Sequence, residues 1–234
     1  MEEGSDDGER VIKDSNPQSE IHNPQSPYPL VFDPFLLPKV WGGDRLARFG
    51  KGVKRGDKVG ESWELADLPS TSAGGAGGGA FRSVIANGPL KGKTLHDAIV
   101  IWGRQLMGEA ALAVGGDFPL LVKLLDASEN LSVQVHPSPG YAAAHPGANL
   151  KTECWYILEA APGAVIYKGV KAGTTRELFA AHIRDGTVVG DLVSVPAVVG
   201  ECHTLPSGTV HALGAGVLVA EVQTPSDTTF RIYD

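Results

Sequence analysis

Four residues in the second half of the chain have side chains that could together ligate a metal ion. His136 ends the segment LSVQVH, Glu153 begins ECWYILE, and His211 lies in PSGTVHALG. Because side chains alternate along a strand, Gln134 and His136 would share one face with Ser132. A half-polar face of this kind is usually exposed to solvent. The glutamate and the second histidine are what favour a metal site.

Glu153 stands at the start of a strongly apolar segment, where an unpaired carboxylate is costly to bury. It could lie exposed at the mouth of the strand, or a bound cation could compensate its charge. Alternation places Glu153, Trp155 and Ile157 on one face and Cys154 on the other. We therefore expect Cys154, and likewise Cys202, to face away from the metal.

The segment that leads to His211 has a spacing typical of a turn between two strands. From Gly200 the sequence fits G-x5-P-x-G-x2-H, with Pro206, Gly208 and His211 in register. Proline and glycine form tight turns, so His211 would project from the strand that follows. This pattern resembles the second motif of the cupin superfamily, whose histidine ligates a metal inside a small β-barrel.

Two imidazoles, a carboxylate and the amide oxygen of Gln134 form a mixed nitrogen–oxygen donor set. Such a set suits Zn²⁺ and leaves room for water or substrate. Fe(II) and Mn(II) also fit sites with two histidines, one carboxylate and open positions. The donor types thus predict a divalent metal site without selecting the metal.

Short apolar segments, separated by glycine, proline, serine or asparagine, must position these residues. Their regular spacing predicts a β-sandwich or barrel. Helices are expected to be few and to pack outside the sheets. One starts at Thr94, its N-cap; another starts at Thr174, has capping-box spacing to Glu177 and ends at Gly186. The expected strands are 118–126, 131–136, 153–159, 163–169, 209–213 and 217–223.

Composition and charge narrow the function classes. Of 234 residues, 42% are hydrophobic and 20% charged, as in a globular domain with a sizeable core. The net charge of −7 is concentrated in residues 1–26, where seven acidic residues outnumber two basic ones. This polar segment is predicted to be a disordered acidic tail. An acidic chain without a basic stripe is not expected to bind nucleic acid, and no apolar run reaches the roughly 18 residues of a membrane span.

Cysteine usage and the N-terminus favour a cytoplasmic location. Two cysteines are too few for a disulfide framework, which indicates a reducing compartment. The N-terminus lacks the positive region and apolar stretch of a secretory signal. The glycine-rich segment from Ser72 to Ala80 lacks the Gly-Lys-Ser/Thr ending of a phosphate-binding loop, so we expect a mobile surface loop.

Six motifs, in order, resemble those of the type I mannose-6-phosphate isomerase family in its short bacterial form. The resemblance runs from about Tyr28 to Asp234. It implies a mainly β, cupin-type jelly-roll barrel with a few peripheral helices, formed by residues 27–234. The motifs are KVWGG (39–43), GESWELAD (60–67), SVQVHP (132–137), KTECWYIL (151–158), PSGTVHALG (206–214) and EVQTPSDTTFRIYD (221–234).

The resemblance also implies a reaction, the interconversion of mannose 6-phosphate and fructose 6-phosphate through ring opening and an enediol. A cation must stabilise the developing oxyanions, a base must move a proton between C1 and C2, and cationic groups must hold the phosphate. Lys151 or a metal-bound water could be the base. When the family's site residues are carried over residue by residue, one Zn²⁺ per chain would be held by Gln134, His136, Glu153 and His211. Arg231 and Lys151 would be catalytic. Lys123 and Ser132 would bind substrate.

Arg231 requires an ordered strand near the end of the chain. The segment DTTFRIY alternates, so Thr229, Arg231 and Tyr233 would share one face. Phe230 and Ile232 would then anchor the other face in apolar packing. With that anchor, Arg231 is expected to point into the barrel beside the metal.

Two departures from the family pattern leave other functions open. SPGYAAAHPGANL follows QVHP, where the family more often has an acidic residue. The chain ends at Asp234, where family members usually continue through a further β-rich module, so we expect that module to be absent, through a natural short form or an incomplete chain. The alternative function is a catalytically silent cupin that binds a sugar phosphate. An iron cupin oxygenase is a third option, which the full set of isomerase motifs disfavours.

Overall fold

The computed structural model describes residues 26–71 and 77–234. The predicted acidic tail therefore lies, except for Ser26, outside the described residues, and so does the first half of the glycine-rich segment. Within the described ranges no helix is long and apolar enough to cross a membrane.

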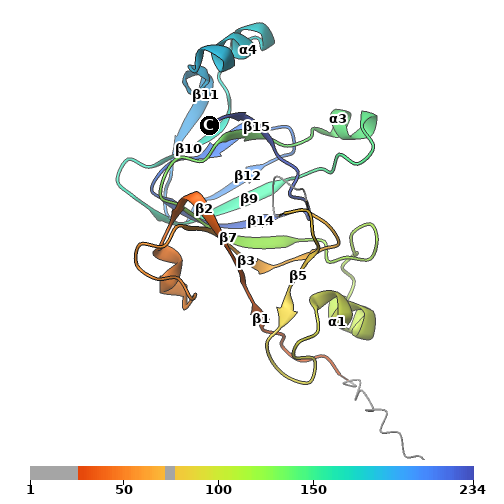
Figure 1. Cartoon of the computed structure of the whole chain (residues 1–234). Coiled ribbons are helices and arrows are strands. Elements are labelled where there is room, and N and C mark those ends of the chain that lie inside the picture. The colour runs from red at the N-terminus through yellow and green to blue at the C-terminus, as the bar shows by residue number, and fades with distance from the viewer. Residues whose placement is uncertain (1–25, 72–76) are drawn as a thin grey trace, which may run out of the picture.

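Two antiparallel sheets make up most of the molecule (Figure 1). The six-stranded sheet has the order β12-β9-β14-β7-β2-β3 and the five-stranded sheet the order β11-β10-β13-β8-β15. All six expected strands are present, and β15 forms at the segment where alternation predicted it. The bounds are β2 Phe35–Gly43, β3 Val59–Leu65, β7 Leu121–Ala127, β8 Val133–Val135, β9 Glu153–Ala160, β10 Val165–Val170, β11 Leu192–Pro196, β12 Cys202–Leu205, β13 His211–Leu213, β14 Val217–Gln223 and β15 Phe230–Tyr233.

The main hydrophobic core lies between the two sheets. Ile157 and Val219 of the six-stranded sheet pack in one cluster with Ile166 and Leu213 of the five-stranded sheet, and all four are fully buried. Burial of one such side chain contributes about 1.5–3 kcal/mol. On β9, Tyr156 points outward, so the predicted alternation of that strand is confirmed.

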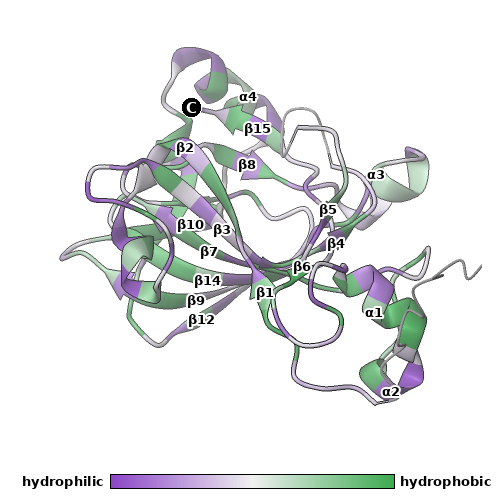
Figure 2. Cartoon of the chain, turned by 60° about the horizontal axis from the view of Figure 1, so that its bottom comes forward, coloured by the Kyte–Doolittle hydropathy of each residue, from purple (hydrophilic) through white to green (hydrophobic). Residues whose placement is uncertain are grey.

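The two predicted helices lie outside the sheets (Figures 1 and 2). In α1 (Leu95–Trp102), Thr94 is the N-cap as expected and forms a capping box with Asp97. In α4 (Arg176–Asp185), the N-cap is Thr175, so the predicted start at Thr174 is wrong by one residue. The Thr175 hydroxyl accepts from the Leu178 N–H, a contact that Thr174 is one position too early to make. Gly186, at φ 73°, ends α4 as expected.

Several short elements had no prediction. Among them, α3 occupies the segment that departs from the family pattern, with Ser138 as its N-cap and proline in its first turn. Two small ribbons, β1–β6 and β4–β5, flank the main sheets. The bounds are β1 Phe32–Asp33, β4 Asp67–Leu68, β5 Phe81–Arg82, β6 Val84–Ile85, α2 Arg104–Met107, α3 Pro139–Ala144, and the 3₁₀ helices η1 Arg45–Phe49 and η2 Val188–Asp191.

Candidate metal centre

Strand register in the five-stranded sheet aligns three of the predicted site residues. His211 on β13 lies opposite Gln134 on β8, and Gln134 lies opposite Arg231 on β15. His136 follows directly after the end of β8. These residues are far apart in sequence, and antiparallel pairing brings them into one row.

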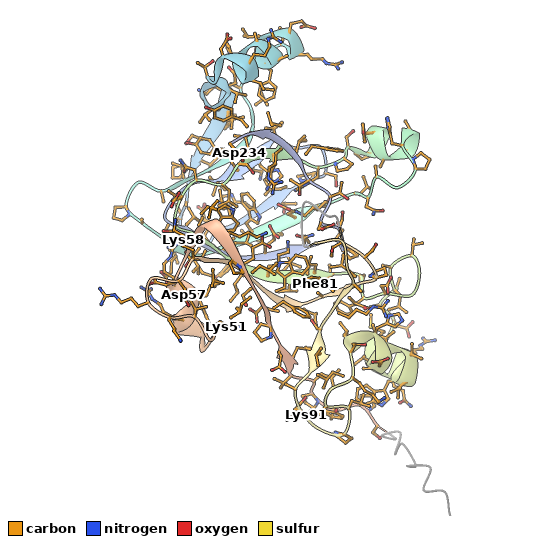
Figure 3. The ribbon with its side chains drawn as sticks, viewed as in Figure 1. Lys51, Asp57, Lys58, Phe81, Lys91 and Asp234 are labelled. Carbon is orange, nitrogen blue, oxygen red and sulfur yellow. The ribbon has the colours of Figure 1, made fainter. Side chains whose placement is uncertain are left out.

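The six-stranded sheet contributes a second row of residues. Trp63 on β3 lies opposite Lys123 on β7, Lys123 opposite Glu221 on β14, and Glu221 opposite Trp155 on β9. All four side chains are buried. At one end of this row, the Trp63 ring contacts the tilted ring of Phe81, which Figure 3 labels, with ring centroids 4.9 Å apart. The row therefore places two charged groups between two indole rings.

His136, Glu153 and His211 converge in the interior, as the sequence predicted. His136 Nε2 lies 3.0 Å from Glu153 Oε1, and His211 Nε2 lies 3.4 Å from Glu153 Oε2. One donor atom from each residue lies within 4.8 Å of the others. Neighbouring ligand atoms on a tetrahedral zinc ion are about 3.3 Å apart, because zinc–nitrogen and zinc–oxygen bonds are close to 2 Å. The spacing fits such an ion.

Both imidazole rings are oriented by backbone carbonyls. His136 Nδ1 lies 3.0 Å from the carbonyl oxygen of Thr228, and His211 Nδ1 lies 2.8 Å from that of Thr209. A carbonyl only accepts, so each Nδ1 must carry the hydrogen, and in a neutral ring Nε2 then presents a lone pair. Carbonyl contacts of this kind orient metal-ligating histidines.

Two acceptor atoms in this cluster lack a hydrogen-bond donor. In the described part of the chain, His211 Nε2 and Glu153 Oε2 are buried and have no hydrogen-bond partner. A lone pair facing a carboxylate oxygen is unfavourable in a buried site unless a cation lies between them. This unsatisfied pair is the observation that fits the three residues to a metal ion.

The protonation states also suit a ligand set. Burial lowers the pKa of His211 to about 4, although Glu153 partly opposes this effect. Burial alone would raise the pKa of Glu153, but Lys151 and then the two histidines hold it well below the ordinary value. At neutral pH, His211 is thus a neutral imidazole and Glu153 a carboxylate, the forms that bind metals.

A cavity of about 320 Å³ opens beside these ligands, between the sheets. The predicted residues Lys123, Ser132, Lys151 and Arg231 all line it, together with Gln134. A second cavity of about 650 Å³ has Ser132 and Arg231 in its wall as well. Every predicted substrate-contacting side chain therefore reaches the cavity that Glu153 also lines.

Lysine and glutamate side chains alternate along the cavity wall. Lys151 Nζ lies 2.6 Å from Glu153 Oε1. Lys123 Nζ lies 3.4 Å from Glu221 Oε1 and 3.8 Å from Glu61 Oε2, and Lys39 Nζ lies 3.1 Å from Glu61 Oε1. Each lysine is therefore paired with a carboxylate.

These pairings shift the pKa values of the buried groups. Burial opposes the charged form of Glu61, but Lys123 and Lys39 outweigh it, so the net pKa is lowered. Burial, followed by the charge of Glu153, raises the pKa of Glu221. For Lys151, the carboxylates of Glu153 and Glu221 outweigh burial and raise the pKa.

Arg231 differs from the three lysines. Within the described residues, its guanidinium has no hydrogen bond or ion pair to a carboxylate. Its neighbour Phe230 is 40% exposed and touches the Tyr141 ring, so the expectation that Phe230 anchors β15 in apolar packing is wrong. Ile232 and Tyr233 pack on the cluster around Val133 instead.

Sequence reasoning missed Glu221 and gave Glu61, Trp63 and Trp155 no role. Glu221 accepts a hydrogen bond from Trp155 Nε1 at 2.8 Å and is buried. Its signal was available, because it is a single acid within the apolar strand VLVAEVQ, like Glu153 at the start of ECWYILE. Cys154, as expected, points away from Glu153: its Sγ contacts Cys202 on the other face of the sheet.

A second histidine–carboxylate cluster lies outside the cavity. His96 Nδ1 is 3.2 Å from Asp67 Oδ2 and 3.3 Å from Asp117 Oδ1. Arg82 approaches both carboxylates, at 3.4 Å from Asp67 and 3.1 Å from Asp117. The sequence had offered no role for His96, because its partners come from β4 and from the segment before β7.

Comparison with known proteins agrees with this site. Residues 73–159 match the family described as phosphomannose isomerase type I, catalytic domain. Over these residues the chain is similar to the type I phosphomannose isomerases. Together with the curated relatives described next, this match confirms the resemblance seen in the six sequence motifs.

Curated relatives extend the match over most of the chain. ManA, the mannose-6-phosphate isomerase of Bacillus subtilis strain 168, is 42% identical over 209 residues, which cover 88% of this chain and 61% of that protein. The mannose-6-phosphate isomerase of Streptococcus mutans strain UA159 is 39% identical over 211 residues, covering 88% and 60%. The chain thus spans about three fifths of the length of these relatives.

Solved structures confirm the fold. The mannose 6-phosphate isomerase from B. subtilis superposes with a TM-score of 0.74 at 38% identity, covering 88% of this chain and 61% of that one. A zinc-bound mannose 6-phosphate isomerase gives a TM-score of 0.60 at 19% identity, covering 87% and 70%. The prediction of a mainly β, cupin-type fold is therefore correct.

Proposed function

We propose that this chain is a zinc-dependent aldose–ketose isomerase that interconverts mannose 6-phosphate and fructose 6-phosphate through an enediol. The observation that carries the proposal is the convergence of His136, Glu153 and His211, with two unsatisfied acceptor atoms, at the wall of a cavity lined by cations. The names of the relatives at 39–42% identity supply the reaction and substrate. We assign residues 27–234 to one isomerase domain.

The proposed metal ligands are His136, Glu153 and His211, with the Gln134 amide oxygen as the fourth. Gln134 lines the cavity and lies opposite His211 in the sheet. Zinc is favoured because a mixed set of imidazole nitrogen and oxygen donors suits it and because a structural relative is a zinc-bound isomerase. When bound, the ion would act as a Lewis acid for negative charge that develops on the sugar oxygens.

Lys151 and Arg231 are the proposed catalytic residues. A proton must leave C2 of the open-chain aldose and reach C1 of the ketose, so a group in the cavity must hold it in between. The Lys151 ammonium is buried beside Glu153 and faces the cavity, where it can contact the sugar oxygens at C1 and C2. Arg231 approaches from the opposite sheet and can stabilise negative charge on the same atoms.

The phosphate, at the far end of the sugar from C1, is proposed to lie beside Ser132, at the wall that the two cavities share. The Ser132 hydroxyl can donate a hydrogen bond to a phosphate oxygen. Lys123, although paired with Glu221, is a cation of the same cavity and is the proposed charge partner of the phosphate.

A direct assay tests the proposal. The purified chain, loaded with one equivalent of zinc, is mixed with mannose 6-phosphate, and the appearance of fructose 6-phosphate is followed by proton NMR. We expect turnover that a chelator abolishes and that zinc restores. The control variant is His203→Ala, which removes a histidine of β12 that is not in the ligand set and should leave turnover unchanged. A zinc-loaded chain with no turnover would contradict the isomerase assignment.

Binding without turnover is the second candidate function. It is favoured by the exposure of Phe230 beside Arg231, because a loosely packed β15 positions a guanidinium less precisely. If the function is binding alone, calorimetric titration with mannose 6-phosphate should show binding by a chain that fails the turnover assay. In either case, we infer a cytoplasmic protein whose partner is a small sugar phosphate, in keeping with its two free cysteines.

A further inference from the structure

The two cysteines of the chain meet on the outer face of the six-stranded sheet. Strands β9 and β12 are antiparallel, with Cys154 opposite Thr204 and Cys202 opposite Tyr156. The cysteines are thus diagonal neighbours on one face, 48 positions apart in sequence, and their Sγ atoms are 2.8 Å apart. This separation is well inside the contact distance of two thiol sulfurs that merely pack.

Strand β12 can move to close the remaining gap. A disulfide requires about 2.05 Å between the sulfurs and a closer approach of the two Cβ atoms than a relaxed diagonal pair provides. β12 is the edge strand of its sheet, as Figure 2 shows, and among the described strands it pairs only with β9. A small shift of an edge strand displaces no further neighbour in the sheet.

Both thiols are open to reagents from solvent. Cys202 is exposed and Cys154 is half-buried, and both are free cysteines. Because alternation turns Cys154 away from Glu153, the thiols lie on the opposite face of the sheet from the proposed zinc ligand on β9. No step of the proposed isomerase mechanism uses these side chains.

We propose that Cys154 and Cys202 are a redox-sensitive dithiol that closes to an intrachain disulfide between β9 and β12. The oxidant is a low-molecular-weight disulfide of the glutathione class. One protein thiolate attacks it, forms a mixed disulfide and releases one small thiol; the second protein thiolate then attacks the mixed disulfide and releases the other. Two protein thiols are oxidised, one small disulfide is reduced to two thiols, and the two protons leave with those thiols.

The link would join two parts of the metal centre. Glu153 immediately precedes Cys154, and β12 leads through the turn at Pro206 and Gly208 to His211. A bond between the strands reduces the conformational freedom of the unfolded chain between the cysteines. We therefore expect the oxidised protein to melt roughly 5 °C higher than the reduced one.

In the test, the full chain is freed of reductant and incubated with millimolar oxidised glutathione. Its mass is then measured by intact mass spectrometry. We expect a loss of about 2 Da, the mass of two hydrogens, no remaining maleimide-reactive thiol, and full reversal by dithiothreitol. Matched single variants, Cys154→Ser and Cys202→Ser, cannot close the ring and should each retain one glutathione adduct.

Three results would overturn the proposal. Wild-type chain carrying two stable glutathione adducts would mean that the sulfurs cannot reach each other. A covalent dimer on a non-reducing gel would mean that the thiols react between chains. Two thiols that both remain open to maleimide would mean that the pair does not oxidise. None of these readouts depends on isomerase activity. Failure of this proposal can therefore be distinguished from failure of the proposed function.

Discussion

Two clusters in this molecule combine histidine with carboxylates at similar distances, yet their chemistry differs. In the cluster of His136, Glu153 and His211, both rings donate their Nδ1 hydrogen to a backbone carbonyl, and His211 turns its Nε2 lone pair to the carboxylate. In the other cluster, His96 directs its Nδ1 at Asp67 and Asp117, where an N–H can donate.

Charge compensation separates the clusters further. Arg82 lies against both aspartates of the second cluster, and Asp67 Oδ2 also accepts from the Phe118 N–H at 2.9 Å. A guanidinium already fills the place that a cation would take. Residue type and distance therefore define only a candidate metal site, and the direction in which each ring nitrogen donates decides between a ligand set and an ion-pair network.

Removal of one histidine from each cluster should give the largest contrast. His211→Ala is expected to weaken zinc binding at least 100-fold, because too few protein ligands remain. His96→Ala is expected to leave zinc affinity unchanged. The measurement is competitive titration against a chromophoric chelator. Equal losses in the two variants would show that the clusters do not differ in the way their hydrogen bonds indicate.

Removal of Arg82 tests the ion-pair network. Arg82→Met should destabilise the fold by about 3 kcal/mol, because the fully buried Asp67 loses its cationic partner. Arg48→Met is the matched control: its ion pair with Glu159 is on the surface, and its loss should cost less than about 1 kcal/mol. Urea unfolding curves at neutral pH give both values. If the second cluster instead binds a cation, added zinc or magnesium should raise the unfolding free energy of Arg82→Met.

The two arginines extend the same contrast to catalysis. Arg82 is saturated by carboxylates, whereas Arg231 faces the cavity without such a partner in the described residues. Arg231→Lys keeps the charge but loses the planar fork of donors, so we expect turnover to fall about 100-fold with zinc content and melting temperature nearly unchanged. Steady-state kinetics and metal analysis of the same preparation measure both. Unchanged turnover would remove Arg231 from the catalytic residues.

Local rules predicted the placement of single side chains better than they predicted the pairing of strands. Alternation placed Glu153 inward and Cys154 outward, and the Gly–Pro–Gly spacing placed His211 after a turn, because each is a local rule. Strand β2 was missed, since Pro38 and the glycines of KVWGG break the pattern that predicts a strand. The strands β3, β11 and β12 were missed as well. Pairing between distant segments has no local signal.

Glu221 and the second cluster show the same limit. A single acid in an apolar strand signals an unusual partner, but only the register opposite Lys123 and Trp155 identifies that partner. Similarly, the N-cap of α4 could not be assigned between Thr174 and Thr175 from spacing alone, because adjacent threonines satisfy the same pattern and the backbone decides which one caps.

Glu61 provides the test with the smallest expected effect. It lies in the cavity, but its carboxylate is paired with cationic side chains, as the carboxylates of the second cluster are. Lys39 and Lys123 lower its pKa below the ordinary value of 4.5 despite the opposing effect of burial. Near and below pH 4.5 the folded state therefore binds fewer protons than the unfolded state. The stability that Glu61 contributes is present above about pH 4.5 and is lost as the pH falls through the lowered pKa of the folded state.

In Glu61→Gln this part of the acid dependence should disappear, and the unfolding free energy should decline less steeply below pH 4.5. Urea unfolding of metal-free protein at several pH values between 3 and 7 measures the two slopes, and identical slopes would mean that the two lysines do not stabilise the Glu61 carboxylate.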